Sequence, residues 1–129
     1  MHSFSSKNNL QNKSLGTYGE KLARKFLKSR NYQILHTNFI TPFGEIDIIA
    51  QEETIIVFVE VKSRQSKYFG SPLEAITSQK CKHIINNCNY YLLKNSLTNS
   101  TVRIDGIGIK LTQNGDFEFL KHVKNIIEI

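Results

Sequence analysis

The stretch that decides the fold is Glu45-Ile46-Asp47-Ile48-Ile49-Ala50-Gln51, followed after a short link by Ile55-Ile56-Val57-Phe58-Val59-Glu60-Val61-Lys62-Ser63. The continuous apolar run that begins at Ile55 predicts a central strand covered on both faces. Because the link is short, we expect the two segments to pair as an antiparallel hairpin. Alternate residues of a strand share a face, so Glu60 and Lys62 project to one side, and the pairing brings Asp47 near Glu60.

The segments on either side of this hairpin complete an α/β pattern. Apolar residues recur at helical spacing before it, and alternating and helical segments follow it. The expected order is α-β-β-β-α-β-β, a mixed central sheet with flanking helices. The expected segments are helix 14–29, strands 32–40, 45–51 and 55–63, a helix that starts at 71–74 and resumes over 78–94, and strands 102–111 and 117–123.

The length of 129 residues suits one domain. Residues 1–14, rich in Ser, Asn and Lys, are expected to form a flexible N-terminal tail before a single domain over residues 15–129. Cys81 and Cys88 fall seven residues apart in one predicted helix. That separation is too long for a disulfide, so we expect two buried thiols.

The apolar segments are too short for a membrane span. The run from Ile55 to Val59 is the longest, whereas a transmembrane helix needs about 20 apolar residues. The first residues also lack the apolar stretch of a secretory signal. The sequence therefore predicts a cytoplasmic protein with no membrane partner.

The net charge of +6 is unevenly distributed. Residues 1–30 carry seven Lys or Arg against one Glu, residues 31–60 carry five acids and no Lys or Arg, and residues 61–129 are again basic. A basic protein around an acidic block indicates a polyanionic partner such as nucleic acid. The alternative is a charge that only keeps the domain in solution. The basic stripe of the first helix is likewise either a phosphate-binding surface or a solvated face.

Familiar phosphate-loop, zinc and serine-nucleophile motifs are absent from the sequence. What remains is Asp47 with Glu60 and Lys62, whose convergence on one face would be unfavourable without a cation between the carboxylates. Hard oxygen ligands favour Mg²⁺ or Mn²⁺ over zinc. Glu45 shares the face of Asp47 and is interpreted as a solvent-facing or supporting group, and Asp105 as a structural acid.

Three motifs resemble the YraN-like family of small bacterial proteins. They are Gly16-Thr17-Tyr18-Gly19-Glu20, Gly44-Glu45-Ile46-Asp47-Ile48-Ile49-Ala50, and Phe58-Val59-Glu60-Val61-Lys62-Ser63-Arg64. The resemblance runs from about Leu15 to the C-terminus. It implies a fold of the PD-(D/E)XK nuclease superfamily, similar to Holliday-junction resolvases. It also implies a catalytic set of Glu20, Asp47, Glu60 and Lys62, with Lys80 as a helper.

The function expected from the charges and the resemblance is metal-dependent hydrolysis of phosphodiester bonds in DNA, with branched or junction DNA among the candidates. Asp47, Glu60 and the Val61 carbonyl would bind Mg²⁺ or Mn²⁺, and Lys62 would orient the attacking water or stabilise developing charge. The expected phosphate contacts are Arg24, Lys28, Arg64, Lys67 and Lys80. The alternatives are a non-catalytic nucleic-acid-binding module and an interaction protein. Because resolvase-like enzymes are often dimers, a homodimer is one expected assembly.

Overall fold

The computed structural model describes residues 2–65 and 78–127, and its elements follow the predicted α-β-β-β-α-β-β order. The predicted helix start at 71–74 lies outside the described residues. The elements are α1 (His2–Ser29), β1 (Gln33–Thr41), β2 (Gly44–Glu52), β3 (Ile55–Gln65), α2 (Ser78–Lys94), β4 (Val102–Leu111) and β5 (Phe117–Val123).

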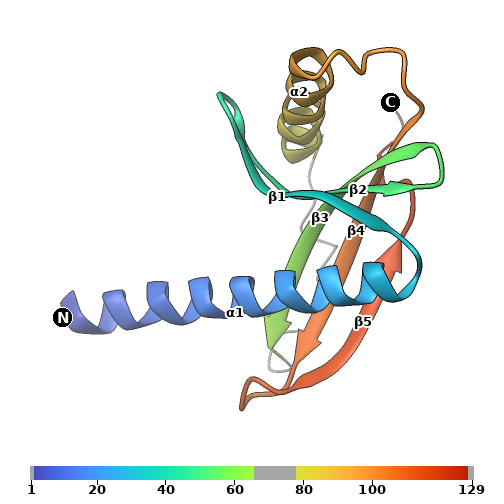
Figure 1. The fold of residues 1–129 in the computed structure, drawn as a ribbon. Helices are drawn as coiled ribbons and strands as arrows, with labels where there is room; N and C mark the ends of the chain where they lie inside the picture. The colour runs from blue at the N-terminus through green and yellow to red at the C-terminus, as the bar shows by residue number, and fades with distance from the viewer. Residues whose placement is uncertain (1, 66–77, 128–129) are drawn as a thin grey trace.

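The five strands form one mixed sheet in which spatial order follows chain order, β1-β2-β3-β4-β5. β1, β2 and β3 are an antiparallel meander, and β4 and β5 are a hairpin. β3 and β4 are parallel, which requires a crossover between them, and α2 lies in that connection (Figure 1). The predicted hairpin of the two deciding segments is confirmed, and β3 is the central strand.

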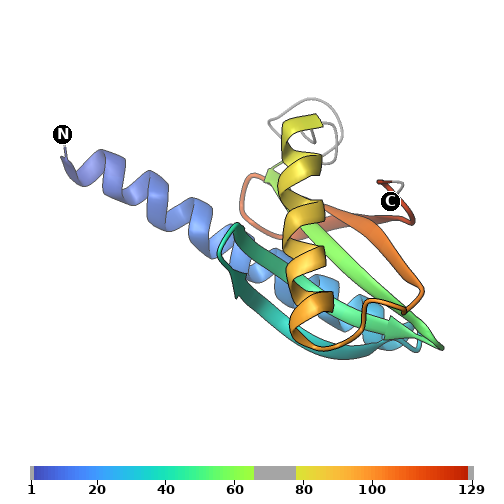
Figure 2. The same cartoon turned by 90° about the horizontal axis from the view of Figure 1, so that it is seen from above.

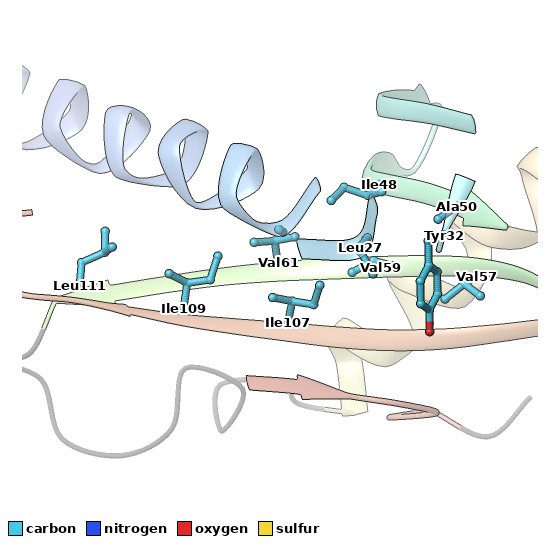
Figure 3. Packing of buried hydrophobic residues seen from close by; sticks show 11 residues of the cluster. Leu27, Tyr32, Ile48, Ala50, Val57, Val59, Val61, Ile107, Ile109 and Leu111 are labelled. Atoms are coloured by element: carbon cyan, nitrogen blue, oxygen red, sulfur yellow. The ribbon is translucent and has the colours of Figure 1, made fainter. Parts of the chain in front are cut away.

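The two helices lie on opposite sides of the sheet (Figures 1 and 2). Ala23 and Leu27 of α1 are fully buried against Val59 and Ile107 in one apolar cluster. Figure 3 shows side chains of β3 and β4 standing between the sheet and α1. The second cluster joins side chains of α2 to the other face of the sheet, among them Cys88, Tyr91, Phe58 and Ile104. Burial on both faces explains the unbroken apolar run of β3.

Helix α1 begins at His2, so residues 2–13 are helical, whereas the sequence pattern predicts a helix only from about residue 14 and a tail over residues 1–14. No proline or glycine lies between residues 2 and 15. A helix fixed by packing over its second half can therefore propagate backwards at little cost. This part of α1 extends beyond the sheet (Figure 1). Flexibility of the segment stays a prediction.

A buried network around Asp105 fastens the last two strands together. Asp105 is fully buried and accepts hydrogen bonds from Arg103 Nε and Nη2, His122 and the Asn125 backbone N–H, at 2.8–2.9 Å. Arg103 also donates to Glu52 of β2 at 3.0 Å. Because each Asp105 oxygen accepts two hydrogen bonds, the interpretation of this acid as structural is supported.

The two cysteines are free thiols. Cys88 is buried as expected, whereas Cys81 is only half-buried, because it lies in the first turn of α2 at the margin of the second cluster. Within residues 2–65 and 78–127, no helix has the length and apolar character needed to cross a lipid bilayer.

Candidate metal centre

The regular alternation of β2 is interrupted at Asp47. Ile46 packs in the cluster under α2, whereas Ile48 packs in the cluster under α1, although two residues apart on a regular strand should share a face. The paired register of β2 with β3 begins only at Ile48. At that point Asp47 Oδ2 accepts a hydrogen bond from the Val61 backbone N–H at 2.8 Å. The Asp47 carboxylate thus replaces a strand carbonyl as the acceptor for β3.

An acidic group forms around Asp47. One carboxylate oxygen each from Glu20, Glu45 and Asp47 lie within 4.8 Å of one another. Glu20 comes from α1 and the other two residues from β2. This spacing allows a single divalent cation to contact all three carboxylates, and oxygen-only ligands suit Mg²⁺ or Mn²⁺. We call Glu20, Glu45 and Asp47 the acidic group.

Helix α1 reaches the acidic group because Gly19 lets it approach β3 closely. A Cβ atom at position 19 would lie 1.8 Å from Ser63 Oγ and 3.1 Å from Ser63 Cβ. A larger residue at this position would require the Ser63 hydroxyl to rotate away and the helix or strand to shift by a few tenths of an ångström. Glu20 follows directly and is also contacted by Asn38 of β1, whose Nδ2 lies 3.5 Å from Glu20 Oε2.

The carboxyl groups of Glu20, Asp47 and Glu60 have pKa values above those of isolated acids. Burial and the nearby Asp47 charge raise the pKa of Glu20 to about 7. Burial and the same Asp47 charge raise the pKa of Glu60 to about 7, against the opposing effect of Lys62. Burial also raises the pKa of Asp47, although the Val61 N–H opposes this. Like charges held together in this way are what a bound cation would neutralise.

Glu60 and Lys62 lie beside the acidic group on the face of the sheet that α2 covers. Lys62 Nζ lies 3.7 Å from Glu60 Oε1, and both side chains are partly exposed. Glu60 is not among the three carboxylates whose oxygens all lie within 4.8 Å of one another, but it is close enough to Asp47 for the Asp47 charge to raise its pKa, as the predicted proximity requires. Val61 contacts Asp47 through its backbone N–H. Metal binding by the Val61 carbonyl stays a prediction.

An open cleft of about 210 Å³ lies between these strand ends and α2. Glu45 and Glu60 line it together with three basic side chains, Lys62, Lys80 and His83. We call it the α2 cleft. Since Glu45 belongs to both sites, the cleft adjoins the acidic group, and Lys80 lies within it as a helper residue would.

The remaining basic residues predicted to contact phosphates are distributed more widely. Arg24 is near enough to Glu20 for its charge to oppose the rise in the Glu20 pKa. Lys28 lies in the last turn of α1, eight residues and about 12 Å along the helix axis from Glu20. Arg64 lies on β3, two residues beyond Lys62 and on the same face by alternation. Lys67 lies outside the described residues.

The sequence does not predict the contacts that Glu45 and Asn38 make at the site. Glu45 is exposed to solvent as predicted, but its carboxylate also belongs to the acidic group, where it could contact a cation directly. Asn38 lies opposite Asp47, between the pairs Thr37↔Ile48 and Phe39↔Ile46, and has a positive φ of 51°. Asn tolerates this conformation better than most residues, but one Asn in a strand is a weak signal.

The segment of the chain that carries this centre matches a known protein family. A model of a family described as "Uncharacterised protein family UPF0102" matches residues 19–109. The chain belongs to the UPF0102 family. The matched UPF0102 segment begins at Gly19 and includes Glu20, the acidic strand β2, Glu60, Lys62 and α2.

Similar UPF0102 proteins come from several bacteria. The chain is 47% identical over 113 residues to a UPF0102 protein of Clostridium perfringens, covering 85% of this chain and 93% of that protein. It is 41% identical over 116 residues to one of Clostridioides difficile, covering 90% and 98%. It is 39% identical over 116 residues to one of Caldicellulosiruptor saccharolyticus, again covering 90% and 98%. The predicted membership of the YraN-like family is thereby confirmed, and placement in the PD-(D/E)XK superfamily stays a prediction.

Proposed function

We propose that this UPF0102 chain is a metal-dependent nuclease that hydrolyses phosphodiester bonds in DNA. The observation that carries the proposal is the position of the acidic group, which adjoins a cleft lined by Lys62, Lys80 and His83. A site for a divalent cation next to basic side chains suits a phosphodiester, whose charge both could bind.

The residues present fit Mg²⁺ or Mn²⁺. Asp47 and Glu45 would hold the ion with Glu20, and Glu60 would complete the oxygen environment from the neighbouring strand. Such an ion supplies Lewis-acid polarisation of the phosphate and activation of water at neutral pH. The raised pKa of Glu20 and of Glu60 supports this assignment, because ionising both carboxyls becomes favourable when a cation is near.

Lys62 is the group proposed to act on the phosphate itself. Its ammonium lies 3.7 Å from Glu60 Oε1 and lines the α2 cleft, so it is both held in place and accessible. A positive charge fixed before the reaction stabilises negative charge that develops on the phosphate in the transition state. Lys80 would bind a second phosphate oxygen or a neighbouring phosphate from the opposite wall of the cleft.

The proposal predicts separable losses on substitution. Asp47→Asn should abolish binding of Mn²⁺ measured by calorimetry and cleavage of DNA in Mg²⁺, because it removes a central carboxylate. Lys62→Ala should retain Mn²⁺ binding but lower the cleavage rate by about 10²- to 10³-fold, the usual effect of losing one preorganised charge. Branched, flapped and linear DNA should be tested in parallel.

Asp116→Asn is the matched control, because Asp116 is an exposed acid in the turn before β5, outside the acidic group. It should leave both measurements unchanged. Mn²⁺ binding by Asp47→Asn at wild-type strength would contradict the assignment of the metal site. Tight, salt-sensitive DNA binding by the wild type without cleavage of any substrate would instead support the binding module, which the basic face of α1 also suits.

A further inference from the structure

The turn between β1 and β2 exposes two large apolar side chains. The Ile40 side chain is 76% exposed and that of Phe43 is 52% exposed. They flank Thr41 and Pro42 at the end of the hairpin, and we call residues 40–44 the hairpin tip. Neither side chain belongs to the two apolar clusters of the described chain. Two large apolar side chains exposed side by side are typical of a surface that contacts a ligand or partner.

The hairpin tip is fixed in position by its underside. The Thr41 hydroxyl is buried and hydrogen-bonds to the buried Asn87 side chain of α2. The Phe43 backbone N–H donates to Thr41 Oγ1 at 3.0 Å. Gly44 has a positive φ of 148°, and a Cβ atom there would lie 3.4 Å from Asn87 Nδ2. The two apolar side chains are therefore presented on a rigid support.

This support is a wall of the α2 cleft. Asn87 lines the cleft, and so does Glu45, whose backbone pairs with Ile40 across the hairpin. The apolar tip thus lies at the edge of a site whose other features are polar or charged: the acidic group, Lys62, Lys80 and His83. A ligand that fits both parts must carry phosphate charge and a flat apolar surface side by side.

Nucleic acid with unstacked bases has this combination. In an uninterrupted duplex the base faces are covered by their neighbours, whereas single strands and branch points offer them to aromatic and aliphatic side chains. We propose that the hairpin tip holds an unstacked nucleobase beside the acidic group, so that the substrate class is branched or single-stranded DNA rather than continuous duplex. This inference rests on the nucleic-acid partner of the proposed function and adds the structure that the substrate must have.

The test compares binding of a forked DNA and a continuous duplex of equal length and charge. 2-Aminopurine at the first unpaired position reports stacking through its fluorescence, and anisotropy gives both affinities with EDTA present to prevent cleavage. The wild type should quench the probe and prefer the fork by about five-fold or more, the least that one base stacked on an aromatic side chain contributes. Ile40→Ser/Phe43→Ser should remove the quenching and the preference while leaving duplex affinity unchanged.

Phe117→Ser/Phe119→Ser is the matched control, because these two phenyl groups of β5 are also exposed but belong to the opposite edge of the sheet. It should keep the fork preference. Equal affinity of the wild type for fork and duplex, or a preference retained by Ile40→Ser/Phe43→Ser, overturns the inference. So does a change from dimer to monomer in sedimentation of that variant, which would make the tip a contact between copies. If the protein cleaves continuous duplex as fast as forked DNA, the proposed role of the hairpin tip is wrong, whereas the proposed nuclease function still holds.

Discussion

At the scale of single residues, Asp47 links the fold to the candidate centre. Its Oδ2 satisfies the Val61 N–H where β2 leaves β3, so one carboxylate ends the strand pairing and also faces Glu20 and Glu45. An acid within an apolar strand is visible in the sequence, and Asp47, Glu60 and Lys62 are predicted on that basis. The membership of Glu45 in the acidic group is not predicted, because it depends on the break in strand alternation at Asp47.

The raised carboxyl pKa values predict that the metal-free protein becomes less stable as pH rises. With a pKa of about 7 in the folded protein against about 4.5 for a free Glu, Glu20 and Glu60 bind more protons when folded than when unfolded. Their stabilising effect is complete below about pH 4.5 and is lost as pH rises through 7. Thermal melts with EDTA should show a falling melting temperature between pH 5.5 and about pH 8.

Two additions separate this effect from general changes with pH. Glu20→Gln should flatten the fall and melt above the wild type at pH 8, whereas Glu118→Gln, on β5 and outside the acidic group, should not. Mg²⁺ should stabilise the wild type at pH 8 more than at pH 6, because ligand binding to the folded state adds stability and needs ionised carboxylates. A melting temperature that rises between pH 6 and 8 without metal would contradict the assignment.

At the scale of elements, the strands are predicted closely because each one shows its own pattern. The alternation over 102–111 and 117–123 reproduces the bounds of β4 and β5, and the apolar run from Ile55 identifies the central strand. The start of α1 is missed because residues 2–13 have no apolar stripe and no helix breaker. The close contact between Gly19 of α1 and Ser63 of β3 is also not predicted, because a glycine in a helix leaves no side-chain pattern that would indicate it.

That contact predicts opposite effects at two glycines of one helix. Gly19→Ala should lower the free energy of unfolding by about 1–3 kcal/mol, since overpacking against Ser63 outweighs the gain in helix propensity. Gly16→Ala should raise it by up to about 1 kcal/mol, because a Cβ atom there would meet nothing within 4 Å and alanine favours the helix. Denaturant unfolding measures both changes.

Gly19→Ala should also weaken Mn²⁺ binding, because moving α1 away from β3 carries Glu20 away from Glu45 and Asp47. Ser63→Gly removes the side chain that the new methyl group would meet and should restore part of both losses. If Gly19→Ala proves as stabilising as Gly16→Ala, the helix does not depend on this close approach.

At the scale of the whole molecule, the candidate centre and the strongest buried ion pairs occupy different parts of the sheet. The acidic group involves α1 and β2, whereas Asp105 joins β4 to β5 and, through Arg103, to Glu52 at the end of β2. One set of buried charges is balanced by partners within the protein. The acidic group around Asp47 is more exposed and has an excess of acids, which is why it is the candidate for a cation.

The Asp105 network predicts a large effect on stability with little effect at the centre. Asp105→Asn should lower the free energy of unfolding by about 3 kcal/mol or more, because Arg103 loses its buried counter-charge and the hydrogen bonds that Asp105 accepts from Arg103 and His122 are disturbed. Mn²⁺ affinity at a temperature where the variant is folded should match the wild type. A loss of Mn²⁺ binding in the folded variant would show that the two regions are coupled, contrary to this prediction.

The order of strands in the sheet has a consequence for how the chain folds. Because β1, β2 and β3 are sequential neighbours, Glu20, Asp47 and Glu60 come together through short loops alone. The parallel pairing of β3 with β4 is the non-local step, since it closes the longest connection between paired strands. Low contact order favours rapid folding, so the meander and its carboxylates are encoded in the part of the chain that is synthesised first and can fold fastest. Lys80 and His83, which belong to α2, then join Lys62 at the α2 cleft with the slower crossover.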